Sequence, residues 1–251
     1  METDWLFNVA KNKVTKYYLE GLTISSYLGA GSLVSPVEGR AVYGIHSFNF
    51  AGLDPLTGDP QGYLDGQLSS DYTNLVNQDP SNLVYHGSRV PEVFGSINNT
   101  FTYRNFSLSF NLIYKLGYYF RRGSINYSGL FDQWSGHADF SDRWQNPGDE
   151  EYTNIPSLIY PNSNPNRDSF YNSSDILVEN GGHLRFQDIT FSYEFNDPSV
   201  SNPLIRKLRL FAYVSNLGLL WSANSQGLDP DYPINDYPLP TMVSFGVKTS
   251  F

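Results

Sequence analysis

The residues best suited to chemistry lie in two polar stretches. His137 and Asp139 place an imidazole two positions before a carboxylate, a pair that general acid–base catalysis can use. Asp54, Asp59 and Asp65 lie in a turn-rich stretch, and carboxylate oxygens in a glycine-containing loop suit Ca²⁺. The aspartate spacing departs from that of an EF-hand loop, so we favour turn capping for these three residues. For His137 and Asp139 we favour surface polarity over catalysis.

Other catalytic and metal-binding patterns are missing from the sequence. The four histidines, including His46, His86 and His183, are scattered and never stand four residues apart on one helix face. The sequence has no Gly-x-Ser-x-Gly nucleophile and no phosphate-binding loop. It has no cysteine, which excludes thiolate metal sites and disulfides. We therefore predict no enzyme activity, no catalytic or metal-binding residue and no cofactor.

Aromatic residues offer a different chemistry, that of ligand contact. The 251 residues include 19 Tyr, 17 Phe and 4 Trp. Aromatic faces stack on sugar rings and on peptide side chains, and four candidates for such contact lie in the long segment 121–181: Trp134, Trp144, Tyr152 and Tyr171. The alternative is that these side chains form the core of the segment's own fold.

The composition restricts the fold and the partners. The chain contains 21 Gly and 15 Pro and almost no amphipathic helical runs, which favours an all-β fold with long loops. The net charge of −9 excludes a nucleic-acid partner, because nucleic-acid binding needs a basic surface. No run of about eighteen apolar residues predicts a membrane-spanning helix.

The elements that position these residues are predicted strands with a period of two. Near the C-terminus Val243, Phe245 and Val247 share one face, while Ser244 and Gly246 share the other. In a soluble sandwich such an apolar face packs in the core, whereas in a membrane barrel it faces lipid. The terminal aromatic residue, Phe251, favours the barrel.

The clearest hairpin lies at 92–120, with a tight turn after Tyr103. Its second arm has an apolar face that is too long for an ordinary sandwich strand of about 5–6 residues. That face consists of Phe106, Leu108, Phe110, Leu112, Tyr114, Leu116 and Tyr118. We expect about seven long strands, centred near Trp5, Tyr43, Ile97, Leu112, Phe191, Phe211 and Phe245, with residues 40–52 as the second. A bulge is expected near Asn216, and segment 121–181 is expected to form an ordered cap.

Several stretches, in this order, resemble the C-terminal part of the SusC/RagA family of TonB-dependent transporters of Bacteroidetes. They are Tyr43-Gly-Ile-His-Ser-Phe-Asn-Phe-Ala-Gly-Leu-Asp-Pro-Leu-Thr-Gly-Asp-Pro60, Phe94-Gly-Ser-Ile-Asn-Asn-Thr-Phe-Thr-Tyr-Arg-Asn-Phe-Ser-Leu-Ser109, Arg143-Trp-Gln-Asn-Pro-Gly-Asp149 with Ile155-Pro156, Leu184-Arg-Phe-Gln-Asp-Ile-Thr-Phe-Ser-Tyr193 and Gly227-Leu-Asp-Pro-Asp231. The resemblance covers essentially the whole chain. No single motif is specific for this family, but the occurrence of all of them in the family's order is.

The resemblance implies that residues 1–251 are the C-terminal part of a 22-stranded transmembrane β-barrel in the cell outer membrane, with 121–181 as a long extracellular loop. It implies uptake of oligosaccharides or peptides, a SusD-like surface lipoprotein as partner, and contact with outer-membrane lipid. The N-terminal plug, the remaining barrel strands and the TonB contact would belong to a missing N-terminal part. The alternative is a soluble extracellular glycan-binding β-sandwich, in which Phe106, Phe110, Tyr114 and Phe191 would be buried in a protein core.

Overall fold

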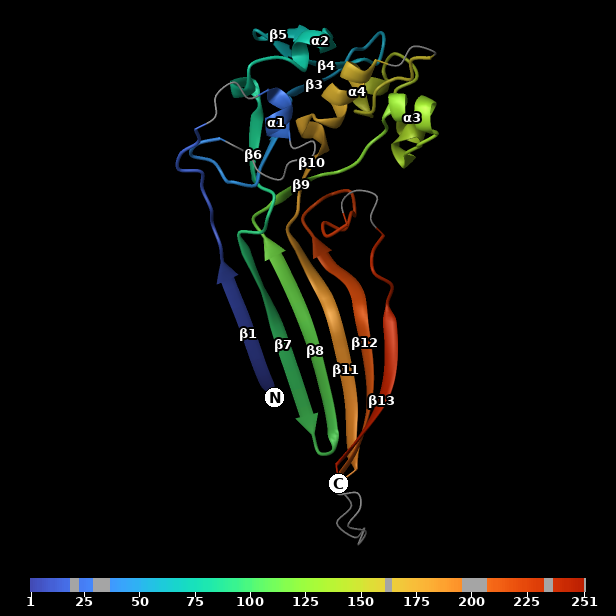
Figure 1. Ribbon diagram of the computed structural model, residues 1–251. Coiled ribbons are helices and arrows are strands. Elements are labelled where there is room, and N and C mark those ends of the chain that lie inside the picture. The colour runs from blue at the N-terminus through green and yellow to red at the C-terminus, as the bar shows by residue number, and fades with distance from the viewer. Residues whose placement is uncertain (19–22, 29–36, 161–163, 196–206, 233–236, 251) are drawn as a thin grey trace.

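The computed structural model describes residues 1–18, 23–28, 37–160, 164–195, 207–232 and 237–250. The chain forms two parts, a long twisted sheet and a cap at one end of it (Figure 1). The terminal Phe251, which favoured a barrel in the sequence, lies outside the described residues. No helix in the described ranges is long and apolar enough to span a membrane.

The long sheet has six antiparallel strands in the order β1-β7-β8-β11-β12-β13. These strands are β1 (Glu2–Val9), β7 (Val93–Tyr103), β8 (Phe106–Leu116), β11 (His183–Phe195), β12 (Lys207–Ser222) and β13 (Met242–Ser250). The expected turn after Tyr103 is confirmed. Only Arg104 and Asn105 separate β7 from β8, and Arg104 takes a left-handed φ of 53°.

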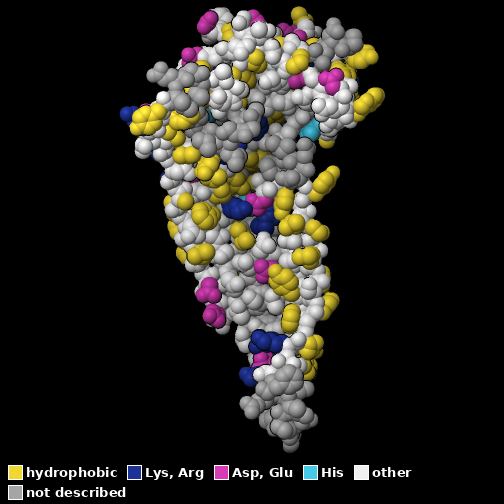
Figure 2. Space-filling model, viewed as in Figure 1, with side chains coloured by type: hydrophobic (Ala, Val, Ile, Leu, Met, Phe, Trp, Pro, Cys, Tyr) yellow, Lys and Arg dark blue, Asp and Glu magenta, His cyan; other side chains and the backbone are white. Residues whose placement is uncertain are grey.

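Side chains of opposite character occupy the two sides of this sheet. The apolar face carries aligned rows such as Phe101, Leu108, Phe191, Ala212 and Phe245. The polar face carries rows such as Asp4, Asn98, Asn111, Asp188 and Ser215. In Figure 2 hydrophobic side chains follow the length of the sheet, and acidic and basic side chains lie beside one another where the sheet meets the cap.

The apolar face is exposed rather than buried. Phe245 is 82% exposed, and Phe106 and Phe191 are each 46% exposed. Phe110 and Tyr114 are half-buried, and within the described ranges no second sheet covers this face. The burial expected of a β-sandwich is therefore wrong for these side chains, because the sheet is a single layer.

Bulges in β11 and β12 shift the alternation of side chains between the two faces of the sheet. Phe186 pairs with Leu112 and Asp188 with Asn111, so Gln187 is an extra residue in β11. In β12 the pairing skips from Ser215 to Gly218, and Asn216 has a φ of 57°. The bulge expected near Asn216 is confirmed.

The strand expected at 40–52 is wrong. Residues there form two short strands of the cap, β2 (Gly44–Ser47) and β3 (Phe50–Leu53), so the described long sheet has six strands rather than about seven. Both sides of β2 are buried, and Phe48 after it is fully buried against Phe170. Alternation cannot distinguish such a strand from a lipid-facing one, because both carry large apolar side chains.

The rest of the cap consists of short elements. Its strands are β4 (Pro60–Leu64), β5 (Gln67–Ser69), β6 (Val84–Ser88), β9 (Tyr119–Arg121) and β10 (Val178–Asn180). Its helices are α1 (Ile24–Leu28), α2 (Tyr72–Leu75), α3 (Tyr127–Gln133) and α4 (Pro165–Asn172), with 3₁₀ turns η1 (Pro80–Asn82), η2 (Ala138–Asp142), η3 (Asp149–Glu151) and η4 (Asp175–Leu177). Strand β2 pairs with β6, β4 lies between β3 and β5, and β9 pairs with β10.

A buried ion pair ties separate cap segments together. Arg167 of α4 is 3% exposed, and its Nε donates to Asp59 Oδ1 at 2.8 Å. Its Nη2 donates to the carbonyl of Ser157 at 2.9 Å. Asp54 accepts hydrogen bonds from the backbone N–H groups of Leu56 and Thr57, which confirms turn capping at that aspartate.

We expect Gly95→Val to destabilise the sheet. A Cβ at Gly95 would lie 2.6 Å from Tyr114 Oη and would also collide with the carbonyl of Leu6. Tyr114 crosses this glycine to accept a hydrogen bond from Trp5 Nε1 at 3.0 Å. The overpacking should lower the free energy of unfolding by about 1–3 kcal/mol, measured by urea unfolding. Gly136→Ala is the control, since its Cβ would meet nothing within 4 Å. Equal urea midpoints for the two variants would contradict this packing.

Candidate ligand-binding site

A cavity of about 920 Å³ lies at the junction of the cap and the sheet. Most of its lining comes from residues between 121 and 139, with Asn172 of α4. Gln226 and Leu228, from the loop between β12 and β13, complete it. Segments far apart in the sequence therefore form one concave polar surface.

Local capping interactions shape the main wall of this cavity. Asn126 begins α3 by accepting a hydrogen bond from the backbone N–H of Gly129 at 2.7 Å. The helix ends at Trp134, which adopts a left-handed φ of 56°. His137 Nδ1 then accepts from the backbone N–H of Asp139 at the start of η2. Helix α3 and the 3₁₀ turn η2 thus fix the segment between them, which includes the lining residues Ser135 and Gly136.

The charges at the cavity wall largely neutralise each other. Asp139 accepts hydrogen bonds from Arg122 Nη1 and Ser124 Oγ, each at 2.6 Å, and His137 Nδ1 lies 3.2 Å from its other oxygen. Burial alone would raise the pKa of Asp139, but the hydrogen bonds from Ser124 and Arg122 lower it by more. Asp139 thus remains ionised and orients Arg122.

The arrangement suits binding of a polar ligand. Gln133, Ser135 and Gln226 present amide and hydroxyl groups at the wall, and these groups both donate and accept hydrogen bonds. Asp132 adds an exposed carboxylate. Such groups can hydrogen-bond either a peptide main chain or sugar hydroxyls.

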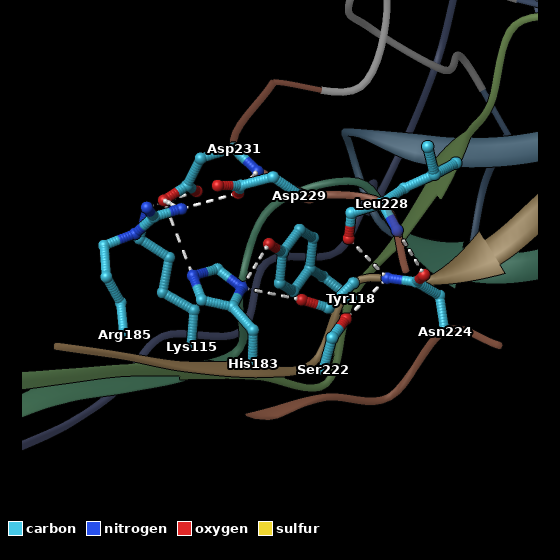
Figure 3. Close-up of polar contacts among 10 residues, drawn as sticks. Lys115, Tyr118, His183, Arg185, Ser222, Asn224, Leu228, Asp229 and Asp231 are labelled. Atoms are coloured by element: carbon cyan, nitrogen blue, oxygen red, sulfur yellow. Dashed lines mark hydrogen bonds and ion pairs between the residues drawn. The ribbon is translucent and has the colours of Figure 1, made fainter. Parts of the chain in front are cut away.

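The loop that completes the cavity is fixed to the polar face of the sheet. Asp231 Oδ1 lies 2.6 Å from Lys115 Nζ, and Asp229 Oδ1 lies 2.5 Å from Arg185 Nη2 (Figure 3). Burial raises the pKa of Asp231, but the nearby His183 and the hydrogen bond from Lys115 lower it well below its ordinary value. The carboxylate is therefore charged where it meets the sheet.

The four aromatic candidates do not come together. Trp134 and Tyr152 are 89% and 88% exposed. Trp144 is buried against Gly58 and donates from Nε1 to Glu150, while Tyr171 is buried with its hydroxyl 3.2 Å from Ser124 Oγ. For this buried pair the structure corresponds to the alternative of a cap core. Ligand contact by the four residues stays a prediction.

The sequence does not single out most of the residues that line the cavity. Arg122, Ser124, Gln133 and Gln226 are ordinary polar residues in loops, and no spacing marks them. The one signal was the Gly227-Leu-Asp-Pro-Asp231 stretch, whose acidic residues prove to bind the sheet. His137 and Asp139, which were assigned to surface polarity, lie at the cavity wall.

Comparisons with known proteins agree with this architecture. No protein-family model matches the chain. A TonB-dependent receptor, P26, of Formosa agariphila is 23% identical over 191 residues, which cover 66% of this chain and 17% of that protein. The solved structure of the RagAB peptide transporter matches 99% of this chain with a TM-score of 0.69 and 17% identity. Its closed-closed state matches with a TM-score of 0.66 and 19% identity.

The chain is similar to a segment of a SusC/RagA-type TonB-dependent transporter. The resemblance found in the sequence is thereby confirmed. The chain spans about a quarter of the RagAB chain that it matches and 17% of the curated relative. The matched proteins are named as a receptor and as transporters, in line with a protein that is not an enzyme.

We expect the Arg122–Asp139 contribution to stability to depend on acidic pH. Since the folded-state pKa of Asp139 lies below the unfolded value of about 3.9, the contribution is complete above that value. It is lost as the pH falls through the folded-state pKa. The difference in unfolding free energy between the native protein and Asp139→Asn, measured in urea, should be constant from about pH 7 to 5 and shrink below about pH 4. A difference that grows as the pH falls would contradict the assignment.

Proposed function

We propose that this SusC/RagA-type segment forms part of the wall and part of the ligand cavity of an outer-membrane transporter that imports peptides or oligosaccharides. The observation that carries the proposal is the single-layer sheet with one exposed apolar face and one polar face. A tilted strand of about 9–11 residues crosses a bilayer, and β7 and β8 each have 11 residues. In the proposed barrel the apolar face contacts lipid, and the polar face lines the lumen.

The unpaired edges of the sheet are a second argument that it belongs to a larger barrel. In the described chain β1 pairs only with β7, and β13 pairs only with β12. Each free edge in a bilayer leaves backbone N–H and C=O groups without partners, which is costly in hydrocarbon. We infer that further strands of the same transporter pair with both edges. A plug and a TonB contact in the N-terminal part follow from the resemblance.

The cap is the proposed extracellular part, and its surface offers a place for a SusD-like lipoprotein. Exposed apolar side chains on it include Leu56, Tyr152, Leu158, Ile159 and Tyr160, of which Tyr152 and Tyr160 are 88% and 75% exposed. Exposed apolar patches of this kind mark interaction surfaces. Trp134 and Tyr152 are the two aromatic candidates accessible to a ligand, so we keep them as proposed contact residues.

Peptide import is supported by the comparison with RagAB, which is described as a peptide transporter. The cavity is also compatible with a sugar ligand, because its exposed groups are amides and hydroxyls. We therefore propose a polar oligomeric nutrient as the ligand class.

A substitution on each face of β13 tests the membrane location. Phe245→Arg should destabilise the transporter by about 2–4 kcal/mol near the bilayer centre, since it puts a charge into lipid. Ser244→Arg, on the polar face, should cost much less. The measurement is urea unfolding in phospholipid vesicles. If Phe245→Arg is as mild as Ser244→Arg, the apolar face does not contact lipid.

Filling the cavity tests its role in import. Gly136 lines the cavity, and a Cβ placed there meets open space, so Gly136→Trp should occupy the cavity without disturbing the cap. Growth on the transported nutrient and its uptake by cells should fall strongly, whereas Gly136→Ala should behave as the native protein. Unchanged uptake in Gly136→Trp, at equal surface expression, would exclude the cavity from the import route.

A further inference from the structure

The loop between β12 and β13 meets the polar face through paired charges. Asp229 binds Arg185 at 2.5 Å, and Asp231 lies 2.6 Å from Lys115 and 3.1 Å from Arg185. The two cations come from neighbouring strands, β8 and β11, and their side chains are 34% and 11% exposed. Two carboxylates thus neutralise two cations at one end of the sheet (Figure 3).

A buried histidine extends this cluster. His183 is fully buried, and its Nδ1 lies 2.9 Å from the carbonyl of Gly181. The same Nδ1 lies 3.1 Å from the hydroxyl oxygen of Tyr118. The other ring nitrogen, Nε2, faces Asp231 Oδ2 at 3.5 Å (Figure 3). Asp231 is thereby contacted from Lys115, Arg185 and His183, which fixes both oxygens of its carboxylate.

The same loop is internally hydrogen-bonded between the cluster and the cavity. Asn224 Nδ2 donates to the carbonyl of Leu228 at 2.9 Å, and its Oδ1 accepts from the N–H of Leu228 at 3.0 Å. Asn224 Nδ2 also contacts Ser222 Oγ at the end of β12. Leu228 is adjacent to Asp229, so the position of the acidic residues determines where Leu228 and Gln226 lie at the cavity wall.

We propose that Asp229 and Asp231 are positioning residues for the ligand cavity. They hold the loop against Lys115 and Arg185 and so fix the wall formed by Gln226 and Leu228. The cavity is in this way coupled to the inner surface of the sheet, and a change in these charges alters it without touching the ligand. The inference rests on the proposed function, since it assumes that this cavity receives the ligand.

Spin-label distances test the positioning role without any ligand. The chain has no cysteine, so Gln226→Cys and Ser135→Cys allow two spin labels to be attached. One label lies on the loop between β12 and β13, and the other lies on the segment after α3 that lines the cavity. The full transporter, with any other cysteine replaced by serine, is reconstituted in lipid nanodiscs for pulsed electron paramagnetic resonance. We expect one narrow distance distribution for the native acidic residues. The double variant Asp229→Asn and Asp231→Asn should broaden it or shift its maximum.

Two control variants distinguish loss of the positioning contact from a general loss of structure. Asp231→Glu keeps the charge and should retain the narrow distribution. Asp65→Asn alters an exposed turn carboxylate elsewhere in the cap and should also retain it. Should the double variant fail to fold, Lys115→Gln combined with Arg185→Gln removes the same contacts from the strands and is expected to broaden the distribution. An unchanged distribution in either folded double variant overturns the proposal.

The outcome is independent of the import test. If Gly136→Trp leaves uptake unchanged but the double variant broadens the distribution, the loop is held as proposed and the cavity is not the import route. If Gly136→Trp blocks uptake and the distribution stays narrow, the cavity functions but Asp229 and Asp231 do not position it.

Discussion

The pairing register of the six long strands decides on which side of the sheet every side chain lies. Because neighbours along a strand alternate between faces, a slip of one residue would move Phe191 and Phe245 to the polar side. Contacts between large apolar side chains on neighbouring strands oppose such a slip. Phe106 and Tyr193 are directly paired, with their ring centroids 4.6 Å apart, and Phe101 stacks diagonally on Phe110 of the next row.

The bulge at Gln187 connects this register to the cavity. Asp188 and Thr190 are on the polar face, so without an extra residue Arg185 would lie on the apolar face. The bulge returns Arg185 and His183 to the polar side, where they meet Asp229 and Asp231. One inserted residue in a strand thus determines where a distant loop binds, and that loop in turn completes the cavity.

Part of this arrangement could be predicted from the sequence. Period-two alternation identified β7, β8, β11 and β13, because one face of each is apolar and the other polar. The prediction for residues 40–52 is wrong because β2 is buried on both sides in the cap, β3 is mostly half-buried there, and Phe48 packs against Phe170. Trp144 and Tyr171, two of the four aromatic candidates for ligand contact, are buried in the cap, and no local pattern distinguishes them from the exposed Trp134 and Tyr152. The cavity itself depends on contacts between distant segments, which no local pattern records.

The lengths of the connections between paired strands also determine how the sheet assembles. Strands β7 and β8 are joined by Arg104 and Asn105 alone, whereas β1 reaches β7 only after much of the cap, with Val9 opposite Val93. Closing a longer loop costs more chain entropy, so the local hairpin forms readily and the β1 pairing is entropically late. The β7–β8 hairpin is therefore the pairing with the lower closure cost, and the pairing of β1 with β7 must be stabilised by contacts along the whole of their shared edge.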